Sequence, residues 1–425
     1  MSSEVRGHWR EALPIFWQAP DKNDALKEFV AGFGPEVSVV TLSFFGRSLH
    51  IVKEVETAKA AIDAINRQVL IKPPSAAKVS LVGGQSIFLS GPELWQRQRE
   101  ATATLLSNVP PETPAIIARE TQALLERWKK QAETQDIQDV ESGIRALVLQ
   151  IGCESLFRSP LSRERNSELA KAISAITHNP AKYIGVNLLG LPQKLQAQFF
   201  PSVSGPIDTL RNYAEDLCAA KTASSDDVGA QILCRRSLIS STVESEKNQA
   251  IEEIAMLLTA AGTPTAPICH AISLLAADKT LKQTIQKELR ETPPNKDGSP
   301  RSEALNKLIF DALKGKPPLA INIPRVAQSS FDLSGVTIKK RDVVFIALEF
   351  MPDDFRGKFF SAGKNACPGK NYAMQLMTGI LAQFAQCDWD FKLAKDFGYF
   401  GFATRSATGG VFEKTDVREC RRAET

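Results

Sequence analysis

The stretch Phe-Ser-Ala-Gly-Lys-Asn-Ala-Cys-Pro-Gly-Lys-Asn-Tyr-Ala, residues 360–373, stands apart from the rest of the chain. It places Cys367 between two glycines, Gly363 and Gly369, directly before an amphipathic helix. The free N–H groups and the dipole at a helix N-terminus favour a thiolate over a thiol, and the glycines let a bulky planar group approach the backbone closely. A thiolate among backbone donors is one of the few protein ligands suited to a haem iron. A single Cys beside a helix start is otherwise often a buried structural residue.

The pattern Phe-x-x-Gly-x-x-x-Cys-x-Gly in this stretch resembles the haem-binding loop of the cytochrome P450 family. The resemblance implies that Cys367 is the metal-binding residue, the proximal ligand of the iron in haem b (iron protoporphyrin IX). It also implies that Phe360 packs near the sulfur, that Gly363 belongs to the same loop, and that the amide of Gly369 helps to tune the thiolate.

Other segments resemble the same family and follow in the same order along the chain. Trp95 and Arg99 match a Trp-x-x-x-Arg pair that contacts a haem propionate, and their four-residue spacing places both side chains on one helix face. Arg325 follows a proline-rich stretch and matches a second propionate ligand. The β-like runs over residues 37–52 match the first sheet of the family, and the resemblance as a whole covers roughly residues 30–420.

The hydrophobic pattern predicts a mostly helical α+β protein with the cytochrome P450-like fold, formed as a single haem-thiolate domain over residues 1–425. Small β-sheets are expected near the N-terminus, beginning with a hairpin over residues 37–52, and again after the helix that matches helix K of the family. Apolar residues at three- and four-residue spacing predict most of the helices, including one long helix over residues 247–275 and a last one over residues 373–384.

Composition excludes several classes of protein. With 425 residues, 43% hydrophobic and 24% charged, the chain is globular rather than disordered or coiled coil. Its 52 Lys and Arg against 48 Asp and Glu leave a net charge of +4, too small to predict a nucleic-acid partner. Since no apolar run suits a membrane span or a signal peptide, and the seven cysteines show no CxxC spacing, we expect a cytoplasmic protein without a membrane anchor.

Three departures from the family pattern concern segments around the expected cofactor. The Glu-x-x-Arg pair of helix K is Asp311 and Lys314 here, and these two side chains cannot form a bidentate fork. Asp354 replaces the Arg of the usual Pro-Glu-Arg-Phe, so we hypothesise an inverted triad in which Lys314 pairs with both aspartates. Asn365 replaces the Arg or His two residues before the Cys. Asn365 can donate a hydrogen bond to a propionate but carries no charge. The positive charge beside the propionates would therefore have to come mainly from Arg99 and Arg325.

A fourth departure lies in Ala-Gly-Thr-Pro-Thr, residues 261–265, which resembles the distal motif of helix I in the family. Thr265 matches the catalytic alcohol, and together with Gly262 and Pro264 it forms the predicted catalytic group. Pro264 replaces the usual acid and cannot bond to the carbonyl of Ala260, so we expect a kink and a polar notch beside the iron. Protons would then come through Thr265, ordered water or the substrate. Alternatively, Pro264 and Pro267 end one helix and begin another.

These features predict a monooxygenase-type enzyme that oxidises a small, largely apolar organic substrate, as in secondary metabolism. The electrons are expected from an external ferredoxin or reductase that docks on the Cys367 side. Segments over residues 72–88, 177–200, 256–261 and 320–323 are mostly apolar and are expected to line the substrate site.

Two alternatives stay open. The altered distal motif and the changed triad also suit a family member that uses peroxide, or rearranges its substrate, without a redox partner, whereas Thr265 favours the monooxygenase. The same departures suit a non-catalytic scaffold, against which the intact Cys367 loop argues. His270, next to Cys269, is assigned to packing because adjacent helix positions face different sides. No GxGxxG or GxxxxGKS motif supports a nucleotide site.

Overall fold

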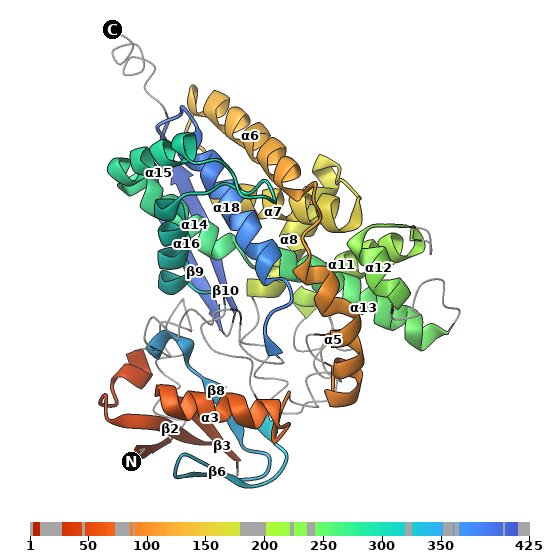
Figure 1. Cartoon of the computed structure of the whole chain (residues 1–425), viewed down its shortest axis with the longest axis vertical. Helices are drawn as coiled ribbons and strands as arrows, with labels where there is room; N and C mark the ends of the chain where they lie inside the picture. The colour runs from red at the N-terminus through yellow and green to blue at the C-terminus, as the bar shows by residue number, and fades with distance from the viewer. Residues whose placement is uncertain are drawn as a thin grey trace.

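A computed structural model of the chain describes residues 3–8, 28–44, 47–72, 86–87, 90–178, 201–221, 225–235, 243–318, 325–351, 360, 365–402 and 404–414. Helices gather on one side of the molecule, and a smaller layer of strands with one covering helix holds the N-terminus (Figure 1). The predicted α+β architecture is therefore confirmed. That the whole chain forms a single domain stays a prediction.

The larger sheet has six strands in the order β1-β2-β3-β8-β5-β4. In sequence they are β1 (Ser3–His8), β2 (Val37–Phe44), β3 (Arg47–Val52), β4 (Leu70–Ile71), β5 (Arg325–Ala327) and β8 (Val343–Ile346). The predicted hairpin over residues 37–52 is the antiparallel pair β2–β3. Helix α3 (Val55–Asn66) packs on the sheet through Ala58, Ala61 and Ala64, whose small side chains are completely buried or nearly so.

The short antiparallel pair β4–β5 brings together two segments that lie far apart in the sequence. Its register pairs Leu70 with Ala327 and Ile71 with Val326. The next residues in that register are Lys72 and Arg325, so the end of this pair carries two basic side chains.

The helical part consists of α5 (Pro92–Ser107), α6 (Thr113–Ala132), α7 (Val140–Phe157), α8 (Arg163–His178), α11 (Pro201–Ala219), α12 (Val228–Arg235), α13 (Glu244–Ala261), α14 (Thr265–Ala277), α15 (Lys279–Glu291), α16 (Glu303–Gly315) and α18 (Lys370–Gln386). There are two further hairpins. The first, β6 (Phe331–Leu333) with β7 (Val336–Ile338), shares a hydrophobic cluster with α3 and the larger sheet, whereas β9 (Leu393–Phe402) with β10 (Thr404–Phe412) packs against the helices.

The main hydrophobic core holds α18 in place. Trp128 of α6 meets Phe384 of α18 edge to face with ring centroids 6.3 Å apart, and it meets Phe412 of β10 in the same way at 5.6 Å. Phe384 and Phe412 are completely buried. Because α18 begins at Lys370, this core fixes the helix that directly follows the Cys367 loop.

The long helix predicted over residues 247–275 is divided into α13 and α14. Gly262 caps α13, and the amides of Gly262 and Thr263 donate to carbonyls three residues back, those of Thr259 (3.2 Å) and Ala260 (3.1 Å). Pro264 has no N–H with which to continue the helical pattern, and α14 starts directly after it. The alternative in which the prolines end one helix and begin another is therefore the observed one.

Several elements had no counterpart in the sequence analysis, among them the parallel strand β1, the short strand β4, the helix α12 and the hairpin β9–β10. Within the described residues, no helix is both long and apolar enough to cross a membrane.

Candidate functional site

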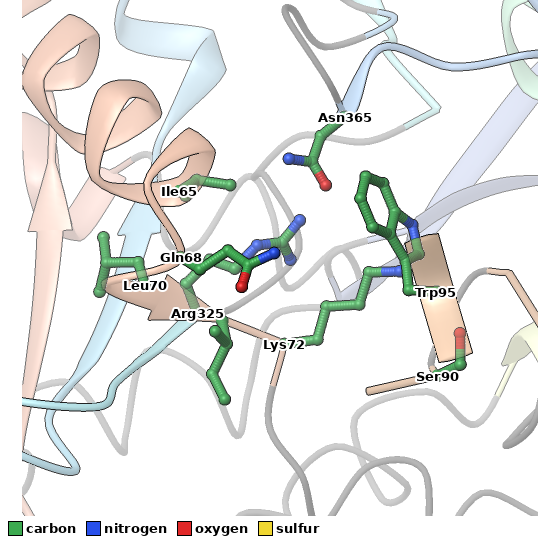
Figure 2. A pocket seen from close by; sticks show the side chains of 9 residues that line it. Ile65, Gln68, Leu70, Lys72, Ser90, Trp95, Arg325 and Asn365 are labelled. Atoms are coloured by element: carbon green, nitrogen blue, oxygen red, sulfur yellow. The ribbon is translucent and has the colours of Figure 1, made fainter. Parts of the chain in front are cut away.

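A pocket lies between the end of the β4–β5 pair, the start of α5 and the segment before Cys367. We call it the basic pocket. It is lined by Ile65, Gln68, Leu70, Ile71, Lys72, Ser90, Trp95, Arg325 and Asn365. Lys72 extends toward the ring of Trp95, and Asn365 lies across the pocket from it (Figure 2). Three of the residues predicted to contact a haem propionate, Trp95, Arg325 and Asn365, are thus brought together.

The basic pocket holds two positively charged side chains, Lys72 and Arg325, in a buried environment. Arg325 is only 4% exposed, and burial lowers the pKa of its guanidinium to about 10. The pKa of Lys72 lies well below its ordinary value, first because of burial and then because of repulsion from Arg325 and Arg99. Attraction to Glu253 opposes that shift. Since burying like charges together costs free energy, this cluster suits an anionic ligand such as a carboxylate.

Lys72 is held by two contacts. Its ammonium donates a hydrogen bond to the backbone carbonyl of Ile87 at 2.8 Å and lies 5.4 Å from the centre of the Trp95 ring. The sequence analysis placed Lys72 only at the edge of a substrate-lining segment and missed it as an anion ligand. The signal for this role is the register of β4 and β5, which sets Lys72 beside Arg325.

Helix α5 connects the basic pocket with the Cys367 loop. The helix begins with Pro92 in its first turn, and the amide of Trp95 donates to the carbonyl of Gly91 at 2.8 Å. One turn after Trp95, the half-buried Arg99 repels Lys72 on one side and attracts the thiolate form of Cys367 on the other. Burial lowers the pKa of Arg99, and the attraction of Cys367 opposes this.

The Cys367 loop is shaped by its own backbone. The Cys367 amide donates to the Phe360 carbonyl at 2.5 Å, while the Ala373 amide donates to the Gly369 carbonyl at 2.9 Å as α18 begins. Asn371 ties the start of α18 to the end of α5 by donating to the Ser107 carbonyl at 2.9 Å. Phe360 is partly buried and packs against the main core.

Cys367 is exposed, although enough protein surrounds its thiol for burial to change its pKa. Burial raises the pKa of the thiol, and a backbone hydrogen bond from Gly369 and the charge of Arg99 both act to lower it. A Cβ on Gly369 would lie 4.0 Å from the Cys367 sulfur, so this glycine approaches the thiol closely. An exposed thiol with a backbone donor and a nearby cation is suited to bind a metal as a thiolate.

The distal segment lies at the α13–α14 break. The Thr265 hydroxyl donates to the Gly262 carbonyl at 2.8 Å, and Thr265 is only 2% exposed. The Ala260 carbonyl was expected to be left free by Pro264. It accepts hydrogen bonds from both the amide (3.1 Å) and the hydroxyl (2.8 Å) of Thr263 instead, because the tightened turn brings that residue within reach. That expectation was wrong.

The predicted inverted triad is described only in part. Asp311 forms an ion pair with Lys307 at 2.7 Å, one turn earlier on α16, and the Lys314 ammonium lies 4.5 Å from the ring centre of Phe310. Asp354 lies outside the described residues, as do Gly363 and the greater part of the segments expected to line the substrate site. His270 lies against the backbone of Gly315, and its ring meets Tyr399 edge to face, which agrees with the assignment to packing.

Comparison with known proteins supports one family. The sequence profile described as Cytochrome P450 matches residues 8–356, so the match ends before the Cys367 loop. The chain is 23% identical over 412 residues to tabersonine/lochnericine 19-hydroxylase from Catharanthus roseus, covering 84% of this chain and 80% of the relative. It is 26% identical over 180 residues to strychnine-11-hydroxylase from Strychnos nux-vomica, covering 35% of each. The crystal structure of the cytochrome P450 CYP102L1 has a TM-score of 0.65 at 16% identity, covering 95% of this chain and 98% of that one, and shows the fold alone.

Proposed function

The chain belongs to the cytochrome P450 family and is a monooxygenase of that family, and from this premise we propose that it holds haem b through Cys367 and oxidises a largely apolar organic molecule. The observation that carries the proposal is that the basic pocket brings Trp95 and Arg325 together with Asn365, which lies two residues before Cys367, so that the pocket and the thiol are neighbouring sites. A planar cofactor with carboxylates at one edge and an iron at its centre would reach both sites.

Each described residue of the site would have a separate task. Arg325, Lys72 and Arg99 would neutralise the propionates, with Trp95 and Asn365 as hydrogen-bond donors beside them. The Cys367 thiolate would bind the iron, with the Gly369 amide and Phe360 around the sulfur. When bound, the haem supplies dioxygen activation, and a thiolate ligand favours cleavage of the O–O bond.

Lys72 is expected to supply the charge that Asn365 does not. Lys72→Met should therefore weaken haem binding by about tenfold, the size of one charge-assisted hydrogen bond. Asn365→His in that background should recover part of the affinity. The measurement is the rate at which the holoprotein loses haem to an excess of apomyoglobin. Haem loss as slow as in the wild type would remove Lys72 from the site.

The nature of the substrate is inferred from two sources. The two curated relatives are named as hydroxylases of tabersonine or lochnericine and of strychnine. Met256 and Ala260 of α13, inside a predicted substrate-lining segment, have apolar side chains that are half-buried and exposed, respectively. Both support a small, largely apolar organic substrate of secondary metabolism.

The source of electrons separates the proposed reaction from its alternative. An external ferredoxin or reductase, and a cytoplasmic location, stay predictions. In a monooxygenation, one atom of dioxygen enters the substrate and the other leaves as water, with two electrons and two protons consumed. Peroxide would supply the same oxygen without a donor, and Pro264 in place of the usual acid is the feature that favours this second candidate.

The test is to incubate the holoprotein with tabersonine or strychnine under ¹⁸O₂ with a surrogate ferredoxin, its reductase and NADPH, and separately with unlabelled hydrogen peroxide alone. The proposal predicts a product with one ¹⁸O atom, formed only with the electron donor. A product formed by peroxide alone would establish the alternative, and no product from either oxidant with any substrate of this class would contradict both.

A further inference from the structure

The peptide group of Ile87 lies between two side chains of opposite charge. Its carbonyl accepts a hydrogen bond from the Lys72 ammonium at 2.8 Å, and its amide donates to the Glu253 carboxylate at 3.0 Å. Glu253 belongs to α13 and is completely buried. One peptide group therefore connects a carboxylate on α13 with the lysine of the basic pocket.

The two hydrogen bonds of this connection strengthen each other. The positive end of the peptide dipole faces the Glu253 carboxylate and the negative end faces the Lys72 ammonium, so both bonds are charge-assisted. An ammonium group has three hydrogens to donate. Because Lys72 lines the basic pocket, the hydrogens that do not go to Ile87 are placed to serve a ligand bound there.

The charges around Lys72 suit a ligand with two carboxylates. Among the described residues, Arg325 and Arg99 lower the pKa of Lys72, and Glu253 raises it. With Lys72 itself, three cations thus face one carboxylate, which leaves an excess of two positive charges for two propionates to balance. If Glu253 were neutral, the repulsion would fall on Lys72, because a lysine gives up its proton far more readily than an arginine.

We propose that Glu253 is a positioning residue for the haem site: acting through the Ile87 peptide and through its charge, it keeps Lys72 protonated and held in place to bind a propionate. This inference rests on the proposed function. It gives α13 a task at the propionate edge of the cofactor in addition to the predicted lining of the substrate site.

The first test measures haem loss from the holoprotein to an excess of apomyoglobin between about pH 6 and about pH 9. It compares the wild type with Glu253→Gln, which keeps an oxygen to accept the Ile87 N–H but carries no charge, and with Glu253→Leu, which removes both. In Glu253→Gln the pKa of Lys72 should fall further, so binding of a propionate must restore the proton and weakens as the pH rises. Relative to the wild type, haem loss should be unchanged at the acidic end and about tenfold faster at the alkaline end, the change that one pKa unit gives.

The matched control is Glu252→Gln. Glu252 is the preceding residue of α13 and is also buried, but it forms an ion pair with Arg211 of α11 at 3.3 Å. This variant removes the same charge one residue away and should keep the wild-type pH profile. The inference is overturned if haem loss from Glu253→Gln follows the wild type at every pH, or if Glu252→Gln changes the profile equally. Fast haem loss from Glu253→Leu alone would also overturn it, because Glu253 would then act only as a structural acceptor.

A second test does not require haem, so it separates failure of this inference from failure of the proposed function. The full chain is labelled with ¹³C at the lysine Cε atoms and titrated by NMR without added haem, and the Lys72 signal is identified by its absence from Lys72→Met. We expect the Lys72 signal to titrate about one pH unit lower in Glu253→Gln than in the wild type, and Glu252→Gln to match the wild type. An unchanged titration in Glu253→Gln would contradict the inference even in a protein that binds haem. A lowered titration in a protein that binds no haem would support the coupling of Glu253 to Lys72 and count against the proposed function.

Discussion

Cys367→Ser should abolish both product formation and the red-shifted carbon monoxide band of the reduced protein. A serine hydroxyl does not provide the thiolate that donates electron density to the iron. Because Cys367 is exposed and its neighbours bond to it through the backbone, the substitution should leave the fold intact. The measurement is the reduced carbon monoxide difference spectrum, recorded together with the melting temperature of the variant.

The matched control is Cys234→Ser, because Cys234 is also an exposed cysteine but lies on α12, away from the Cys367 loop. This variant should retain both the spectrum and the activity of the wild type. If Cys367→Ser kept the red-shifted band, another residue would have to be the ligand, and the assignment of the loop would fail.

Arg325→Met should have opposite effects on the protein with and without its cofactor. With haem bound, loss of a buried cation beside a propionate should weaken haem binding by about 10- to 100-fold, from the roughly 1.5–3 kcal/mol of a hydrogen bond between charged groups. Without haem, the buried guanidinium and its repulsion of Lys72 both disfavour folding. Methionine relieves both costs at similar length, so the melting temperature of the apoprotein should stay unchanged or rise.

Haem transfer to apomyoglobin and thermal unfolding of the apoprotein measure these two effects separately. Arg290→Met, at an exposed position on α15, is the control and should change neither. A large fall in apoprotein stability for Arg325→Met would show that Arg325 is mainly structural. Unchanged haem binding would exclude it as a propionate ligand.

The part of the site that depends on short motifs was predictable. A few neighbouring residues are enough to identify the Cys367 loop, the Trp95–Arg99 pair and Arg325. The structure brings Trp95, Arg325 and Asn365 together around one pocket. Their roles toward a cofactor remain predictions. Lys72 was not assigned there because its position depends on the register of β4 with a strand more than 250 residues later in the chain, which no local pattern encodes.

The remaining differences between the predicted and the observed structure concern pairings within one helix and between strands that are distant in the sequence. Asp311 forms an ion pair with Lys307 at i−4, which the sequence analysis did not consider, while the pairing of Lys314 with Asp311 and Asp354 stays a prediction. Strand β1 pairs in parallel with β2. Parallel strands need a long connection instead of a tight turn, so no hairpin pattern in the sequence could indicate this pairing. Glycines within β9 and β10 similarly weaken the alternation that would indicate strands.

The most direct test of the central claim is the carbon monoxide difference spectrum of the purified wild-type protein after reduction. The account predicts stoichiometric haem and a red-shifted band typical of a thiolate ligand. A spectrum without a haem band, or with the band of a neutral proximal ligand, would contradict the claim that Cys367, Arg99 and the basic pocket together form a haem-thiolate site.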